Sequence, residues 1–152
     1  MKKQSYFKKF AAVAMAAVMT FAFTACGSDD AGTENGGADA NAKFVIGGIG
    51  PTTGGAAVYG QAVKNAAEMA AEEINAAGGI NGYPVEFLWQ DDEHDTEKAV
   101  NAYNSLKDQD MQMLMGTVTS APCTAVVALT SEDNMFQLTP SGSAVESIKG
   151  DN

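Results

Sequence analysis

The hydrophobic and polar positions from Lys43 onward alternate between the two-residue period of strands and the longer period of helices. An apolar, glycine-rich run at 43–50 predicts a buried strand, and residues 56–79 predict a helix that ends at Gly78 and Gly79. The apolar positions of this helix that are expected to face inward are Tyr59, Val63, Ala66, Ala67, Ala70 and Ile74. Further strands are predicted at 83–92, 111–116 and 135–140, separated by helices at 95–110 and 120–134.

Strictly alternating strands and helices predict an α/β, doubly wound domain, in which right-handed crossovers place helices on both faces of a parallel sheet. Met111, Met113 and Met115 alternate along the third strand and are expected to pack on one buried face. Ligands of such sheets bind at the carboxyl ends of the strands. Two of these ends, 116–122 and 139–143, are hydroxyl-rich loops that open onto helix N-termini, which attract anions. The pattern predicts a site of uncharged donors for a small carboxylate.

The N-terminal part of the chain has the pattern of an export signal. Four lysines precede an apolar run at 10–23, which is shorter than the roughly 20 residues that a membrane-spanning helix needs. The following "FTACGS" resembles a bacterial lipobox, although Phe23 stands where Leu is more common. Residues 1–25 are therefore predicted to be a lipoprotein signal peptide, with Cys26 the lipidated first residue of the mature chain. The alternative is an ordinary thiol beside an ordinary cleavage site.

Residues 26–42 are predicted to be a flexible tether between the lipid and the folded domain, because 27–42 contain no aliphatic residue larger than alanine. The protein is then extracytoplasmic and anchored to the cell membrane by the lipid at Cys26. The mature chain, with five lysines, no arginine and 19 acidic residues, has a net charge of −14. This charge disfavours nucleic acid and anionic lipid headgroups as partners.

Several kinds of chemistry are disfavoured by the residues present. Cys123 is interpreted as a residue at a helix start rather than a nucleophile, because nothing places His94 beside it as a base. The acidic run at 91–95 is interpreted as a solvated strand end with a helix cap, and a metal site there is the less favoured alternative. The glycines at 48, 50 and 54 match neither dinucleotide-binding nor P-loop spacing. No catalytic residues, metal or cofactor are therefore predicted.

From Lys43 to its end the chain resembles a known family. The motifs "GPTTGGAAVYG", "INAAGGINGYPV", "GTVTSAP" and "LTPSGSA" are similar, in order and spacing, to the N-terminal lobe of the type I periplasmic binding proteins of ABC importers, in particular the leucine/isoleucine/valine-binding group. The resemblance implies a two-lobed clamp that closes on an amino acid and delivers it to a membrane permease. Residues 43–152 are expected to be an incomplete N-terminal lobe, with the second lobe missing from the sequence.

The resemblance also implies roles for four residues. Tyr59 matches an aromatic residue that lines the pocket for the ligand's side chain, and Ser120 matches a hydroxyl residue that takes the carboxylate. Ser141 matches a residue whose backbone carbonyl accepts from the α-ammonium, and Ser143 matches one that contacts both charged ends of the ligand. Alternatives stay open at this point: Tyr59 is a core residue, and the serines at 120 and 143 are only helix caps.

The predicted function is therefore capture of a small amino acid, branched or aliphatic, for an ABC permease, without catalysis. Amides, urea-like solutes and short peptides are alternative ligands, and an exported sensory module or an exported enzyme at the same sheet edge are alternative classes. Two departures from the family concern the site: His94 and Thr119 stand where some relatives have a disulfide, and the acid for the ammonium belongs to the missing lobe.

Overall fold

The computed structural model describes residues 42–149. The predicted leader, the lipidation site at Cys26 and all but the last residue of the tether lie outside the described residues. Strands and helices alternate as predicted: β1 Phe44–Gly50, α2 Ala57–Ala76, β2 Val85–Asp91, α3 Thr96–Lys107, β3 Met113–Gly116, α4 Ser120–Glu132, β4 Gln137–Leu138 and the 3-10 helix η1 Val145–Ile148.

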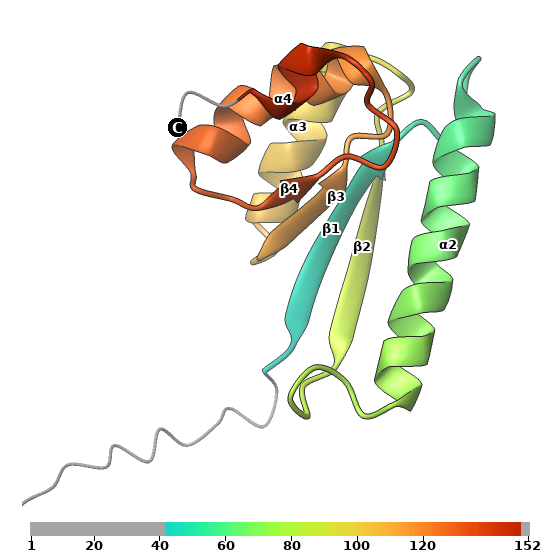
Figure 1. Ribbon diagram of the computed structural model, residues 1–152, viewed down its shortest axis with the longest axis vertical. Helices are drawn as coiled ribbons and strands as arrows, with labels where there is room; N and C mark the ends of the chain where they lie inside the picture. Colours follow the sequence, from blue (N-terminus) through green and yellow to red (C-terminus); the bar gives the residue numbers. More distant parts are fainter. Residues whose placement is uncertain (1–41, 150–152) are drawn as a thin grey trace, which may run out of the picture. The chain divides into compact units, whose positions relative to one another are not determined.

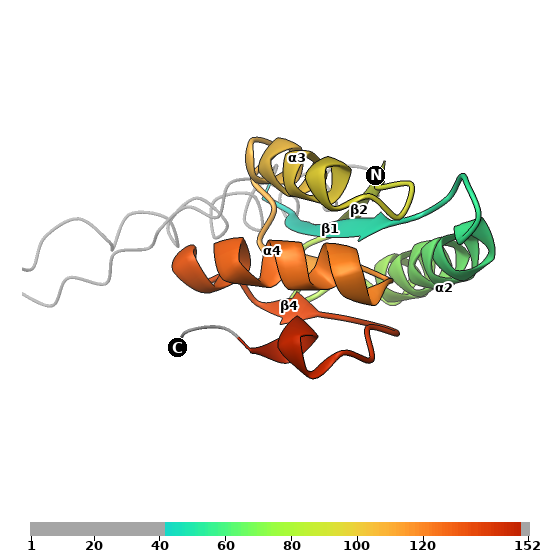
Figure 2. The same ribbon diagram turned by 90° about the horizontal axis from the view of Figure 1, so that it is seen from above.

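The four strands form one parallel sheet in the order β2-β1-β3-β4 (Figure 1). The chain steps outward from β1 to β2 and then returns across β1 to β3, so the direction of winding reverses between β1 and β3. This reversal carries α2 over one face of the sheet and α3 and α4 over the other, and the predicted doubly wound α/β class is confirmed. Figure 2 shows α3 and α4 side by side.

The main core lies between the sheet and the α3/α4 layer. Its largest fully buried side chains are Ile49 of β1, Leu114 of β3, Tyr103 and Leu106 of α3, and Val126 of α4. Asp95 caps α3 by accepting from the backbone N–H of Lys98 at 2.9 Å, as a strand end followed by a helix start requires. The central strands β1 and β3 are therefore both anchored in this core.

Helix α2 packs less deeply, and the expected inward position of Tyr59 is wrong. The side chain of Tyr59 is 62% exposed, and the buried residue of α2 is its neighbour Gly60. A Cβ atom at Gly60 would lie 1.8 Å from the carbonyl oxygen of Pro51, so only glycine permits this close approach. Gly60 therefore faces the loop that follows β1. The neighbouring Tyr59 faces outward.

The three alternating methionines do not share a face, because β3 begins only at Met113. Asp110, at a left-handed φ of 60°, turns the chain before the strand. Met111 is buried in the α3/α4 core, whereas Met113 and Met115 line the opposite face of the sheet beside α2. The predicted shared face therefore holds for two of the three residues.

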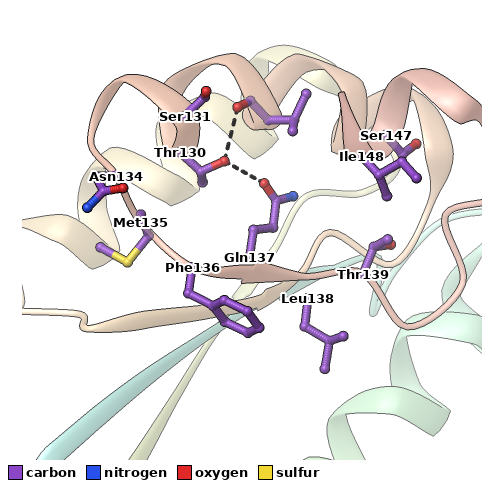
Figure 3. A pocket seen from close by; sticks show the side chains of 11 residues that line it. Thr130, Ser131, Asn134, Met135, Phe136, Gln137, Leu138, Thr139, Ser147 and Ile148 are labelled. Atoms are coloured by element: carbon purple, nitrogen blue, oxygen red, sulfur yellow. Dashed lines mark hydrogen bonds between the residues drawn. The ribbon is translucent and has the colours of Figure 1, made fainter. Parts of the chain in front are cut away.

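Strand β4 is shorter than the predicted 135–140 and is one of the two edge strands of the described sheet. A hollow of about 530 Å³ lies beside it, between α4 and η1 (Figure 3). Phe136 and Leu138 are largely exposed here, while the Thr130 hydroxyl donates to Gln137 Oε1 at 2.7 Å (Figure 3). This side of the sheet presents apolar side chains that the described residues leave uncovered.

The core at Leu114 provides a test of this packing. Leu114→Ala removes a fully buried side chain from a central strand, and we expect it to lower the free energy of unfolding by about 2–5 kcal/mol in urea denaturation. The matched control Val58→Ala, at an exposed position of α2, should change it by less than about 0.5 kcal/mol. Equal effects of the two substitutions would contradict the assigned core.

Candidate functional site

The candidate site lies at the carboxyl ends of β1 and β3, where the winding reverses. Hydrogen bonds draw the loops together at this edge. The backbone N–H of Val118 donates to the carbonyl of Ile49 at 3.2 Å, which joins the loop after β3 to the end of β1. From the loop after β4, the Thr139 hydroxyl donates to the Thr117 carbonyl at 2.8 Å, and the Ser141 hydroxyl donates to the Val118 carbonyl. Loops from three strands therefore meet at one edge.

Two of the predicted binding residues are in direct contact. Ser120, the first residue of α4, accepts with its Oγ from the backbone N–H of Ser143 at 3.0 Å and from that of Ala144 at 3.3 Å. Ser141 lies two residues before Ser143 on the same loop. The structure thus brings together the three predicted serines, although 23 residues separate Ser120 from Ser143 in the chain.

Tyr59, the fourth predicted binding residue, belongs to a different element. It stands in the first turn of α2, directly after the loop that follows β1, and no hydrogen bond between described residues joins it to the serines. Because its ring is mostly exposed, the interpretation of Tyr59 as a core residue is excluded. Its aromatic ring therefore presents an exposed surface at the start of α2.

The N-terminus of α4 is open. Thr119 occupies the N-cap position with an extended backbone, yet its side chain makes no capping hydrogen bond, and no acidic residue stands in the first turn. No described oxygen accepts from the backbone N–H groups of Ser120 or Ala121, and Pro122 has no N–H. A 13-residue helix with free N–H groups at its positive end is suited to hold a carboxylate.

Asp91, at the end of β2, anchors the glycine-rich loop. Its carboxylate accepts from the Thr52 backbone N–H at 2.9 Å, the Thr53 hydroxyl at 2.7 Å and the Glu93 backbone N–H at 2.9 Å. Burial raises the pKa of Asp91, but these hydrogen bonds outweigh it and lower the pKa to about 2. The sequence analysis did not predict this role. The pattern that could have indicated it is a pair of threonines in the loop after one strand and an aspartate at the end of the neighbouring strand.

The loops after β2 and β3 are joined by His94 and Thr119. His94 Nδ1 lies 2.8 Å from Thr119 Oγ1. A hydrogen bond thus joins the two positions at which the resemblance implies a disulfide in some relatives. The backbone N–H of His94 in turn donates to Asp92 Oδ1 at 2.9 Å. Burial of Asp92 raises the pKa of its carboxyl group, opposed by the His94 hydrogen bond.

Residues 42–149 contain no group of three or more His, Cys, Asp or Glu side chains placed to hold a metal ion. Cys123 is buried and lies 3.3 Å from Gln137 Nε2 through its Sγ, while the ring of His94 is bonded to Thr119. Within the same residues, no helix combines the length and apolar character needed to cross a membrane.

Comparison with known proteins shows the family to which the chain belongs. Residues 43–152 match the family described as Periplasmic binding protein. The chain is 36% identical over 110 residues to the Leu/Ile/Val-binding protein BraC3 of Rhizobium johnstonii, covering 72% of this chain and 30% of that protein. It is 34% identical over 97 residues to the leucine-, isoleucine-, valine-, threonine-, and alanine-binding protein of Pseudomonas aeruginosa, covering 64% of this chain and 26% of that protein.

A solved structure shows the same relation. The substrate-binding protein LivJ of a branched-chain amino acid transporter from Streptococcus pneumoniae, in complex with isoleucine, aligns with a TM-score of 0.66 at 29% sequence identity. The alignment covers 70% of this chain and 31% of LivJ. The chain therefore spans less than a third of the length of these relatives.

The hydrogen bonds to Asp91 predict a specific acid sensitivity. Because the folded-state pKa lies below the usual value of about 3.9, the charged carboxylate contributes stability above about pH 4 that is lost as the pH falls toward 2. Asp91→Asn should therefore flatten the dependence of unfolding free energy on pH in this window, measured by urea denaturation at several pH values. Asp108→Asn, an exposed acid after α3, is the matched control and should keep the wild-type profile. An unchanged profile in Asp91→Asn would contradict the assigned anchor.

Proposed function

Because the chain belongs to the periplasmic binding protein family, we propose that it is the substrate-binding component of an ABC importer. It captures a small amino acid with a branched or aliphatic side chain and hands it to the membrane permease without catalysis. The two relatives, both named as binding proteins for leucine, isoleucine and valine, support this ligand class. Lipid attachment at Cys26 holds the protein on the outer side of the cell membrane, within reach of the permease.

The observation that carries the proposal is the junction of Ser120 and Ser143 at the open N-terminus of α4. The ligand's carboxylate accepts from the free N–H groups of α4 and from the hydroxyl groups of these two serines. Uncharged donors suffice for this, because the aligned peptide dipoles of the helix place partial positive charge at its N-terminus. The chain contains no arginine that would otherwise hold a carboxylate with two parallel hydrogen bonds.

The other end of the ligand meets different groups. The backbone carbonyl of Ser141 accepts from the α-ammonium, and the exposed ring of Tyr59 forms one wall for the aliphatic side chain. An aromatic wall suits an aliphatic side chain because both surfaces lose contact with water when they meet.

Residues 43–152 form the N-terminal lobe of a two-lobed clamp in this proposal, and a second lobe completes the site. The chain's match to about 30% of the length of BraC3 supports this division. The uncovered apolar side chains beside β4 also support it, since Phe136 and Ile148 are each more than half exposed. Closure of the second lobe over the serine edge removes the ligand from water.

A ligand screen tests the substrate class. The full-length mature protein, without its lipid, is heated in the presence of each common amino acid. A ligand at 100 times its dissociation constant adds about 2.7 kcal/mol of stability, which raises the melting temperature by several degrees. We expect the rise for leucine, isoleucine and valine. A rise with amides or short peptides alone would replace the ligand class, and no rise with any of these solutes would refute the proposed function.

Serine substitutions test the carboxylate site. Ser143→Ala removes a hydroxyl group but keeps the backbone N–H that donates to Ser120, so the junction persists. A hydrogen bond to a charged group contributes about 1.5–3 kcal/mol, and we expect leucine affinity to fall roughly 10- to 100-fold in calorimetric titration. Ser120→Ala should weaken binding at least as much, because it also removes the acceptor for two N–H groups. The control Ser105→Ala, on exposed α3 surface, should bind like wild type; equal affinity in all three variants would contradict the assigned roles.

A further inference from the structure

The N-cap of α4 has the right residue in the right conformation but does not cap. Thr119 has φ −112° and ψ 151°, the extended backbone from which an N-cap hydroxyl normally accepts from the second or third N–H of its helix. Here the third position is Pro122, which has no N–H, so Ala121 offers the one remaining donor for such a cap. The side chain of Thr119 nonetheless makes no capping hydrogen bond.

The Thr119 hydroxyl is instead bonded to His94, whose Nδ1 lies 2.8 Å from Oγ1. Neighbouring groups hold the imidazole in this place. The His94 backbone N–H donates to Asp92 Oδ1 at 2.9 Å, and the Asp95 N–H donates to the Asp92 carbonyl at 2.7 Å. These two bonds close a tight turn in which His94 adopts a left-handed φ of 64°. A buried aspartate thus fixes the turn that presents His94 to Thr119.

We propose that His94 is a positioning residue for ligand binding: by holding the Thr119 hydroxyl away from α4, it keeps the N–H group of Ala121 free for the ligand's carboxylate. The inference rests on the proposed function, and it assigns His94 a role without contact to the ligand. Without the imidazole, the Thr119 hydroxyl rotates about χ1 and accepts from the Ala121 N–H. The ligand then competes with an internal cap for the same donor.

This role differs from that of a simple bridge between two loops. If His94 and Thr119 only hold the loops together, removing either partner has the same effect on binding. If His94 acts by restraining a competing hydroxyl, loss of His94 is harmful only while that hydroxyl is present. Thr119→Val, which keeps the branched shape and removes the hydroxyl, separates the two cases.

The first experiment measures the affinity of the full-length protein for L-leucine by calorimetric titration. His94→Ala should weaken binding about tenfold, equivalent to about 1.4 kcal/mol and typical of one N-cap. Thr119→Val should stay within about threefold of wild type, and the double variant should return to that range. His94→Gly, which adopts a positive φ without strain, repeats the test should His94→Ala fold poorly. Thr124→Val, one turn further along α4, is the matched control. A double variant as weak as His94→Ala, or an unchanged His94→Ala, would overturn the proposal.

The second experiment needs no ligand and therefore separates this inference from the proposed function. Hydrogen exchange of the Ala121 amide is followed by NMR in the free protein. We expect fast exchange in wild type, about tenfold protection in His94→Ala and fast exchange again in the double variant. This pattern would support the inference even if leucine, isoleucine and valine failed to bind to wild type. Such a failure would contradict only the proposed amino-acid ligand. An Ala121 amide equally exposed in all three proteins would overturn the inference.

Discussion

The pairing of β1 with β3 is the constraint on which the rest of the structure depends. Ile49 pairs with Gly116 in the sheet, and the ladder continues past the strand end through the bond from Val118 to the Ile49 carbonyl. A Cβ atom at Gly116 would lie 2.6 Å from that carbonyl oxygen, so the backbones approach too closely for any other residue. This contact sets the glycine-rich loop and the start of α4 side by side at the reversal of winding, and every predicted binding serine lies beyond it.

The electrostatics of this edge run against those of the chain as a whole. With 19 acidic residues and no arginine, the protein is poorly suited to attract an anion at long range. Two of the acids at this edge, however, are engaged in hydrogen bonds within the protein. Asp91 accepts from three donors of the adjoining loops, and Asp92 is buried in the turn that holds His94. What remains directed outward is a set of N–H and hydroxyl groups with the positive end of a helix dipole.

The fold was largely predictable because its signals are local. Alternating periods gave the order of elements, and the parallel sheet follows from that order. Features that depend on a single local detail were not predictable. The close approach of Gly60 to Pro51 leaves Tyr59 facing outward. The left-handed backbone at Asp110 places Met111 on the face of the sheet opposite to Met113 and Met115. At the site, the convergence of Ser120 and Ser143 followed from strand-end loops. The hydrogen bonds that Asp91 accepts, and the one between His94 and Thr119, could not be predicted, because side-chain partners across loops leave no periodic pattern.

The two ends of an amino acid make unequal demands on a single lobe. A carboxylate needs donors, which a helix N-terminus provides from the backbone whatever its sequence. An ammonium group needs acceptors, and a charged partner is the strongest. Asp91 and Asp92, at the end of β2, are both engaged in holding the loops of this edge. Releasing either one would free the loop that it holds. In the proposed function the described residues therefore serve mainly the carboxylate end of the amino acid, and the second lobe supplies the charged partner of the ammonium group.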